Sequence, residues 1–299
     1  MSFDLHIHST YSDGTMTPAE ILQLARKYGL RTIALTDHDT TEGIAEALVQ
    51  GKKQNIEVLT GIELSASFDS HPVHILGYGI DHTDPLLFEN LKDIQKARKD
   101  RNDKIVARLQ SFGLDISLDE LDIISKSGQT GRPHIARLLV KKGFVSSTDQ
   151  AFDRYLGKKG SAYTPRKSLP ADQAIKMINM AKGIAVLAHP IIINVPFQSL
   201  VRMILKLRTA GLAGIEVFYP SHPPPFRLKL EKLCTEYGLL ASGGSDFHGL
   251  LHPWSRLGCM IQGQSASDEI VEKLKAHLPA GRKHPSPQPS PQGEGGSPK

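Results

Sequence analysis

The sequence predicts an α/β fold in which strands and helices alternate and close into a βα barrel that a helical insertion interrupts. Short β-branched runs alternate with helical patterns over residues 1–83 and again over residues 168–280. Between these two parts, over residues 84–167, apolar residues recur at helical spacing instead. With 299 residues, the chain is long enough either for one large domain that carries such an insertion or for two domains.

The first part of the expected barrel covers residues 1–83. Its helix over 17–28 has the clearest start, because residues 17–20 (TPAE) supply an N-cap, a first-turn proline and an N3 acid. Asp39 and Thr40 are candidates for capping the helix that follows them. The expected elements of this part are strands over 3–7, 32–35, 56–59 and 73–78 and helices over 17–28 and 41–53.

The insertion over residues 84–167 is expected to be helical and basic. Residues 90–167 hold 17 Lys and Arg against 9 Asp and Glu, so this segment carries a net charge of +8 and the rest of the chain −3. Such a concentration of positive charge either faces phosphate groups or forms solvated helix surfaces. Helical patterns occur around Phe88 to Phe112 and over 118–125, 134–142 and 148–156.

The second part of the barrel, residues 168–280, returns to alternation. It begins with a helix capped at Ser168 and ends with a strand and a helix through His277. Residues 281–299 differ, because 12 of these 19 residues are Gly, Pro or Ser, and we expect a mobile tail there. The other elements expected in the second part are strands over 184–188, 214–218 and 239–242 and helices over 197–210 and 226–237.

Composition narrows the class of protein. No apolar stretch approaches the ~20 residues that a membrane-spanning helix needs, and the start MSFDLHIH does not resemble a secretory leader. The two cysteines cannot form a disulfide framework, which favours a reducing compartment. We therefore expect a cytoplasmic protein without a membrane or an obligate protein partner.

Histidines and acids stand at the ends of the predicted strands. In a parallel barrel the carboxyl ends of all strands open at one face, so residues that are far apart in sequence meet there. His74 lies within its strand and must point inward to join the others. The residues concerned are His6, His8, Asp37, His38, Glu63, His74, His189, Asp246 and His248.

These residue types are suited to a metal site. Side chains alternate along a strand, so His6 and His8 point to the same side and within reach of one cation. The set offers nitrogen and oxygen ligands without thiolate, which suits Zn, Mn or Fe, and it exceeds the need of one ion. A site of two or three ions, bridged by Glu63 or another carboxylate, is expected. His222 either touches substrate or shapes its loop, and the remaining histidines are expected to be solvated: His71, His82, His252, His277 and His284.

Six segments resemble the PHP family, named for polymerase and histidinol phosphatase. They are HIHSTYSDGTMTP at the start, LTDHDT (35–40), GIE (61–63), VHILGYGID (73–81), AHP (188–190) and GGSDFHG (243–249). The resemblance implies a distorted (βα)7, TIM-like barrel with two or three divalent metal ions that hydrolyses phosphoesters. It implies three ligand sets: His6, His8, Glu63 and Asp246; Glu63, His74 and His189; and Asp13, His38 and His248. Asp13 stands where some family members have histidine.

The insertion resembles a stand-alone branch of that family, which includes nucleoside 3′,5′-bisphosphate phosphatases and a 5′-to-3′ exonuclease. The segments concerned are GRPHIARLLVKKGFV (131–145) and AFDRYLGKKGSAYTP (151–165). Arg132 offers a planar fork for a phosphate and His134 a second donor, on what is expected to be a substrate lid. Each such residue taken alone could equally be a surface charge. The candidate substrate-binding residues are Arg132, His134, Lys158, Lys159, Arg166 and His222.

The resulting hypothesis is metal-dependent hydrolysis of a phosphomonoester of a nucleoside 3′,5′-bisphosphate or at the 5′ end of a short RNA. Glu63, Asp246 and Asp37 are the candidate catalytic carboxylates, and Asp37 is expected to orient ligand imidazoles by accepting their second ring N–H. We expect Mn²⁺, with Zn²⁺, Fe²⁺ and Mg²⁺ as alternatives. The alternative functions are a phosphatase for another small metabolite, a DNA exonuclease, an amidohydrolase-type enzyme and a non-enzymatic sensor.

Overall fold

The computed structural model describes residues 3–125, 129–165, 168–249, 256–258, 260–261, 264–265 and 267–279. At its centre is a mixed sheet of eight strands, whose order is β1-β2-β3-β4-β6-β7-β8, with β5 beside β3. The predicted α/β class is confirmed. The strands are β1 (Phe3–Ile7), β2 (Thr32–Leu35), β3 (Glu57–Phe68), β4 (His71–Tyr78), β5 (Leu169–Pro170), β6 (Ile184–Leu187), β7 (Gly214–Phe218) and β8 (Leu240–Gly243).

The expectation that all strands are parallel is wrong for β4, which runs antiparallel to both β3 and β6. The reason is the length of β3, which continues to Phe68 and leaves only Asp69 and Ser70 before β4. Both residues have positive φ, and a connection of two residues makes a hairpin, whereas a parallel crossover needs about a dozen residues. Because β4 is reversed, its first half lies at the edge where the parallel strands end.

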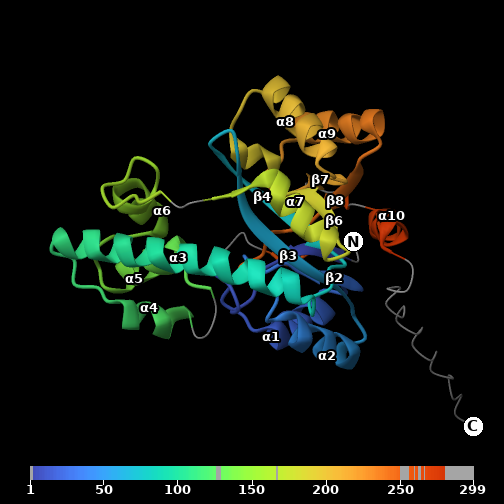
Figure 1. Ribbon diagram of the computed structural model, residues 1–299. Helices are drawn as coiled ribbons and strands as arrows, with labels where there is room; N and C mark the ends of the chain where they lie inside the picture. Colours follow the sequence, from blue (N-terminus) through green and yellow to red (C-terminus); the bar gives the residue numbers. More distant parts are fainter. Residues whose placement is uncertain are drawn as a thin grey trace, which may run out of the picture.

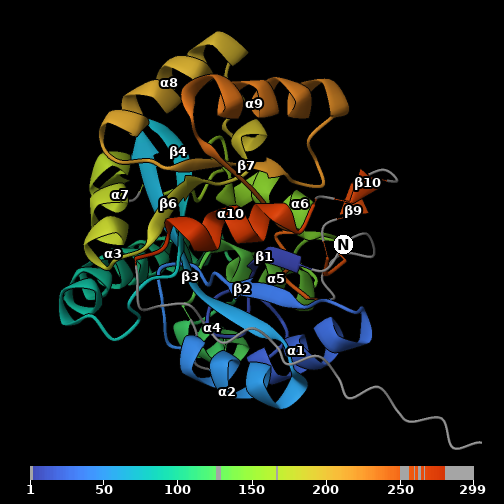
Figure 2. The ribbon, with the colours of Figure 1, turned by 90° about the vertical axis from the view of Figure 1, so that its right-hand side faces the viewer.

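Six helices pack on the sheet (Figures 1 and 2), with α1 and α2 at one end and α8 and α9 at the other. The capping box predicted at Thr17 and Glu20 is confirmed. The helix expected from Ser168 begins instead at Ala171, because Leu169 and Pro170 form β5 beside β3. The six helices are α1 (Pro18–Lys27), α2 (Ile44–Gln54), α7 (Ala171–Met180), α8 (Phe197–Thr209), α9 (Pro224–Tyr237) and α10 (Glu269–His277).

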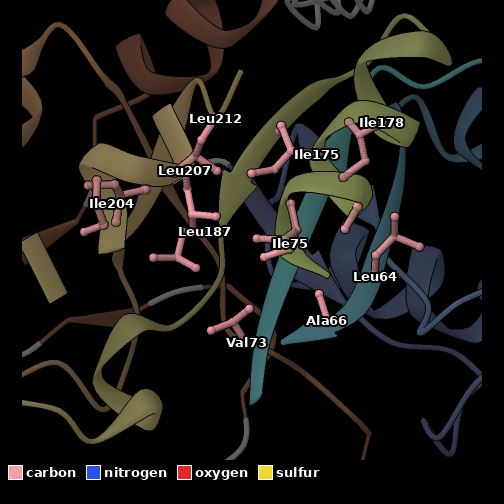
Figure 3. Packing of buried hydrophobic residues seen from close by; sticks show 14 of the residues in the cluster. Leu64, Ala66, Val73, Ile75, Ile175, Ile178, Leu187, Ile204, Leu207 and Leu212 are labelled. Atoms are coloured by element: carbon pink, nitrogen blue, oxygen red, sulfur yellow. The ribbon is translucent and has the colours of Figure 1, made fainter. Parts of the chain in front are cut away.

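Apolar side chains between the sheet and these helices form the core. Figure 3 shows part of the largest cluster, in which Ile75 and Leu187 of the sheet meet Ile175 of α7 and Leu207 of α8. All four side chains are almost fully buried. The opposite faces of β4 and β6 contribute to a second apolar cluster, whereas β7 buries Glu216 on that side.

The strand β1 combines apolar and buried polar residues. Phe3 and Leu5 belong to one apolar cluster and Ile7 to another, and the register with β2 shifts between Asp4 and Ile7. Asp4 and His6 are buried polar residues of this strand. Beyond the strands proper, a parallel bridge joins Ile7 of β1 to Phe247, which follows β8. The backbone N–H of His8 donates to the carbonyl of Phe247 at 2.9 Å. This bridge links the two ends of the strand order next to His6 and His8.

The stretch between β4 and β5 is helical, as predicted, and has an apolar cluster of its own that includes Ile105, Leu109, Ile135 and Leu139. The helices lie together on one side of the sheet (Figure 1). No helix in the described ranges is long and apolar enough to cross a bilayer. The helices of this stretch are α3 (Pro85–Ser111), α4 (Leu118–Ser125), α5 (Arg132–Lys141), α6 (Thr148–Ala151) and the π-helical turn η1 (Phe152–Leu156).

Two smaller elements complete the described fold. The 3₁₀ turn η2 (Pro190–Ile193) follows β6, and β9 (Met260–Ile261) pairs with β10 (Gln264–Ser265) in a separate two-stranded sheet. The last strand expected for the barrel is therefore not part of the main sheet. The tail expected over 281–299 lies outside the described residues.

Gly244 directly follows β8 and lies close to β1. A substitution at this position therefore tests how β1 and the end of β8 pack against each other. A Cβ at Gly244 would meet the Cβ and backbone N of His6 at 2.3 and 2.4 Å. Because backbone atoms cannot move aside cheaply, Gly244→Ala should lower the free energy of unfolding by about 2 kcal/mol. The control is Gly238→Ala, where φ is +62° but no atom lies within 4 Å, with an expected loss of about 1 kcal/mol. Urea unfolding measures both, and an equal loss in the two variants would contradict the close approach of β1 and residue 244.

Candidate metal centre

The structure brings the nine predicted metal-ligating residues together at one edge of the sheet. The imidazole rings of His8 and His248 stack with their centroids 4.1 Å apart, and those of His6 and His8 lie 5.1 Å apart. His74 reaches this group because β4 is reversed, so its position near the start of β4 lies beside the ends of the parallel strands. The nine residues are His6, His8, Asp13, His38, Glu63, His74, His189, Asp246 and His248.

Three groups of potential ligand atoms each lie within 4.8 Å of one another. The first contains the same four residues as the first expected ligand set. In the second, His38 takes the place expected for His189, whose Nε2 nevertheless lies 3.0 Å from Glu63 Oε1. The third contains the expected Asp13, His38 and His248, joined by His8. The groups are His6, His8, Glu63 and Asp246; His38, Glu63 and His74; and His8, Asp13, His38 and His248.

Glu63 is the centre of the arrangement. Its side chain is fully buried in β3, and each of its two oxygens faces a different set of imidazoles. Oε1 lies 2.9 Å from His74 Nδ1 and 3.0 Å from His189 Nε2. Oε2 lies 3.0 Å from His38 Nδ1, 3.2 Å from His8 Nε2 and 3.3 Å from His6 Nε2. A carboxylate placed in this way can bridge two cations.

The electrostatics of the cluster favour positive charge at its centre. Burial by itself would raise the pKa of Glu63, but the imidazoles of His38, His74 and His6 hold that pKa well below its usual range. In return, although burial lowers the pKa of His8, the carboxylates of Asp246 and Glu63 raise it to about 10. The carboxylates thus stay ionised and attract cationic charge, which protons or a metal ion can supply.

Several polar atoms of the cluster are buried without a hydrogen-bond partner among the described residues. They face one another at 3.0 Å or more without the geometry of a hydrogen bond. Orphaned buried polar atoms are costly, and their convergence on one point fits the ligand shell of divalent cations. The atoms are His6 Nε2, His8 Nε2, Asp13 Oδ1, His38 Nδ1 and Glu63 Oε2.

The carboxylates next to the cluster have hydrogen-bond partners that differ from those expected. Asp37, expected to accept a ring N–H, accepts instead from the Ser9 backbone at 2.7 Å and from the hydroxyls of Ser9 and Ser12, both at 2.6 Å. The Ser12 hydroxyl in turn lies 3.5 Å from His8 Nδ1, so Asp37 reaches His8 through a serine. Among the described residues outside the nine predicted metal ligands, Glu216 is a carboxylate that contacts an imidazole directly, at 2.9 Å from His6 Nδ1.

A pocket of about 610 Å³ adjoins the cluster. Asp13, His38 and His74 line it on one side. On the other side, four cationic side chains reach it from the helical stretch between β4 and β5: Arg98, Arg101, Arg132 and Lys158. The pocket therefore combines the candidate metal ligands with a concentration of positive charge.

Two of the six candidate substrate-binding residues, Arg132 and Lys158, line this pocket. Lys159 is exposed and outside the lining. His134 is buried and its Nδ1 accepts from the Gly131 backbone, while burial and the nearby Arg137 lower the pKa of its imidazole to about 4. Arg166 lies outside the described residues.

His222, the sixth candidate, packs among aromatic side chains. Its ring contacts those of Tyr219 and Phe226, and its Nδ1 lies 2.8 Å from the carbonyl of Val217. The ring is almost fully buried and does not line the pocket. The hydroxyl of Tyr219, which the sequence analysis did not single out, lies 3.4 Å from Asp246 Oδ2.

Arg98 and Arg101 were not expected in the site. They are three residues apart on α3, a helical spacing that puts both on one face, but the sequence does not say which face meets the pocket. Arg98 pairs with the buried Asp39 and also donates to Ser65 Oγ at 3.0 Å. Asp39 is therefore not a helix cap, and α2 begins only at Ile44. The pair fastens α3 to the residue that follows His38.

Arg132 is oriented by its surroundings. Its Nη1 donates to the carbonyl of Leu156 at 3.1 Å, and its guanidinium lies 5.8 Å from the centre of the Phe152 ring. Burial and the neighbouring Arg98 both lower the pKa of Arg132. The positive charges of Arg98 and Arg132, which both line the pocket, repel each other. An anion bound between the two guanidinium groups would therefore be stabilising.

Known proteins resemble this chain over most of its length. It is 36% identical over 248 residues to the 3′,5′-nucleoside bisphosphate phosphatase of Chromobacterium violaceum, covering 83% of this chain and 87% of that protein. It is 35% identical over 246 residues to the 5′-3′ exoribonuclease of Haemophilus influenzae, covering 82% and 89%. A solved structure described as an amidohydrolase from Chromobacterium violaceum, with bound sulfate and no metal, matches with a TM-score of 0.83 and 33% identity, covering 93% and 97%.

The α/β fold, the buried cluster of imidazoles and carboxylates and these relatives define a hydrolase, and the relatives named for their reactions place it among enzymes that cleave phosphoric esters. The PHP domain matches residues 4–156, and the similarity to the two enzymes extends over most of the chain. The chain belongs to the PHP family.

Proposed function

We propose that this enzyme uses two or three divalent metal ions to hydrolyse a phosphomonoester of a nucleoside 3′,5′-bisphosphate or at the 5′ end of a short oligoribonucleotide. One observation carries the proposal: a single pocket is lined by candidate metal ligands and by Arg98, Arg101, Arg132 and Lys158. A substrate with two phosphate groups can use both sides of such a pocket. The names of the two relatives support the same substrate classes.

The proposed metal centre uses the residues of the buried cluster. Metal ions there would supply Lewis acidity toward the phosphoryl group and an activated water. Glu63 would bridge two ions through its two oxygens, and Asp246 would share an ion with His6 and His8. Asp37 would hold Ser9 and Ser12 in place beneath His8. The nitrogen and oxygen donor set suits Mn²⁺, our preferred assignment, and also Zn²⁺, Fe²⁺ or Mg²⁺.

The third ion would be held by Asp13, His38 and His248. Asp13 lies 3.1 Å from His248 Nε2 and 3.9 Å from His38 Nε2. A carboxylate here brings a negative charge that a histidine would not, which favours harder cations such as Mn²⁺ or Mg²⁺ at this position.

The cationic side of the pocket would bind the second phosphate. Arg132 can offer two parallel N–H groups to phosphate oxygens, and Lys158 adds a mobile charge near the opening. His134 and Lys159 are proposed to support this region from the second layer or from outside the pocket, and His222 from behind Tyr219. Arg166, which lies outside the described residues, stays a candidate for binding the substrate. Substrate choice would then depend on the helical stretch and the reaction on the sheet edge.

An amidohydrolase is the alternative class that the name of one similar structure favours. An enzyme of that class typically bridges its metals with a lysine or a carboxylated lysine, whereas the side chain that contacts five imidazoles here is Glu63. A pocket lined by four cationic side chains suits a substrate with several negative charges better than an amide. A phosphatase for another small metabolite would need the metal centre but not all four cationic side chains of the pocket.

The domain arrangement is part of the proposal. Residues 1–83 and 168–280 would form one distorted (βα)7 barrel, with residues 84–167 as the substrate lid and 281–299 as a tail. The bridge between Ile7 and Phe247 supports closure, because it joins the first strand of the order to the residues that follow the last strand. The content of two cysteines supports a cytoplasmic location.

The test is product release by the purified Mn-loaded protein: inorganic phosphate from 3′-phosphoadenosine 5′-phosphate, AMP and histidinol phosphate, and inorganic phosphate or 5′-mononucleotides from a short 5′-phosphorylated RNA. We expect strong preference for the bisphosphate or the RNA. Equal and slow release from all four substrates would contradict a binding site for a second phosphate. Only a phosphoesterase activity without that specificity would then remain. No metal-dependent release from any would contradict both.

A further inference from the structure

We infer that Glu216 is a positioning residue that holds His6 and His189 in place and thereby couples the metal positions that these two histidines serve. The inference rests on the proposed metal centre. Glu216 lies in β7 between Ile215 and Val217, which point into the apolar core, so its own side chain points to the polar side of the sheet. It is fully buried, and an acid in that place must be stabilised by donors.

One oxygen of Glu216 fixes His6. Oε1 accepts from His6 Nδ1 at 2.9 Å, and a carboxylate acceptor requires that this nitrogen carry the proton. The lone pair of His6 is therefore on Nε2. That atom lies 3.3 Å from Glu63 Oε2 and 3.3 Å from Asp246 Oδ1, in the first ligand group. Glu216 thus determines both the tautomer and the direction of the His6 ring.

The other oxygen of Glu216 fixes the backbone of His189. Oε2 accepts from the His189 N–H at 2.7 Å, immediately after β6. His189 has φ +24° and ψ +60°, a conformation that is uncommon for a residue with a side chain. This turn directs His189 Nε2 to Glu63 Oε1 at 3.0 Å, whereas His6 faces the other oxygen, Oε2. The hydrogen bond that His189 N–H donates to Glu216 holds the turn that positions the imidazole ring.

The two contacts make the carboxylate hard to replace. A glutamine at position 216 has one acceptor oxygen and one NH₂ group, so it can accept from His6 or from His189 but not from both. Whichever donor is left faces another N–H in a buried site. Glu216→Gln should therefore disturb both histidines together, although Glu216 itself belongs to none of the three ligand groups.

The experiment measures metal binding rather than turnover. Wild type, Glu216→Gln and Ser242→Ala are stripped with chelator, titrated with Mn²⁺ against a competing chelator, and analysed for bound metal. Ser242 is the matched control, because it is paired with Glu216 on the next strand, is equally buried, and bonds to the Tyr78 hydroxyl at 2.8 Å. Glu216→Gln should weaken Mn²⁺ binding about 10–100-fold at more than one position, and Ser242→Ala should leave it unchanged.

The outcomes separate this inference from the proposed function. If wild type binds no Mn²⁺, the metal centre itself is wrong. If wild type binds metal and Glu216→Gln binds it equally well, only the role of Glu216 is wrong. Loss of metal at a single position would overturn the coupling.

A second measurement does not depend on the variant folding. In wild type with ¹⁵N-labelled histidine and bound Zn²⁺, His6 should carry its proton on Nδ1 and the metal on Nε2. The opposite tautomer would contradict the role of Glu216.

Discussion

Replacing Glu63 by glutamine is expected to lower metal-dependent phosphate release by about 10³-fold or more. Among the residues that the structure describes, Glu63 is the one carboxylate that contacts five imidazoles, and its two oxygens face different ligand groups. A glutamine keeps the size but loses the charge and one acceptor oxygen, so it cannot bridge two cations. Bound metal typically supplies several kcal/mol of transition-state stabilisation, and about 4 kcal/mol corresponds to 10³-fold.

The control for this variant is Glu57→Gln on the same strand. Glu57 is also almost fully buried, but it lies at the start of β3 and bonds to Thr32 and Lys275, away from the cluster. This variant should lose some stability and keep its turnover. Circular dichroism checks that Glu63→Gln is folded. Turnover by a folded Glu63→Gln within about tenfold of wild type would contradict a bridging role.

Replacing Arg132 by alanine should lower kcat/KM for 3′-phosphoadenosine 5′-phosphate about 100-fold and leave that for AMP nearly unchanged. The guanidinium lines the pocket and is held in place by the Leu156 carbonyl. Hydrogen bonds to charged groups contribute about 1.5–3 kcal/mol, which is about 10–150-fold, and only the substrate with two phosphates can lose them.

Arg154→Ala is the matched control for Arg132→Ala. Arg154 lies in the same turn η1 that packs beside Arg132, but it is exposed and does not line the pocket. It should affect neither substrate. An equal loss on AMP and on the bisphosphate in Arg132→Ala would show that Arg132 acts on the structure of the pocket rather than on the second phosphate.

Much of the candidate site was visible in the sequence because its residues stand at strand ends. The rule that parallel strands open at one face brings His6, His38, His189 and Asp246 together without any knowledge of distances. His74 was harder, because it lies inside a strand. Its place depends on the reversal of β4, which follows from a β3 that runs on to Phe68 and a turn of only two residues. The length of β3 was underestimated because its second half lacks a continuous β-branched run.

Other parts of the site could not be assigned from the sequence. The sequence does contain a signal for Glu216. An acidic residue between Ile215 and Val217 in an otherwise apolar strand is unusual, and it needs a buried hydrogen-bond partner. Its partners, however, come from β1 and from the end of β6, and only the fold shows that these meet. Arg98 and Arg101 stand among many basic residues on α3. Which of them turn toward the pocket depends on how α3 docks, and the ion pair with Asp39 determines that.

The central claim is that a cluster of divalent metal ions held by His, Asp and Glu residues hydrolyses the phosphomonoester. The most direct test is reconstitution: the protein is freed of metal with chelator, assayed with 3′-phosphoadenosine 5′-phosphate, and then titrated with Mn²⁺ while bound metal and phosphate release are measured together. We predict no release from the metal-free protein and full recovery as two or three ions bind. Full phosphate release by the folded, metal-free protein would contradict the account.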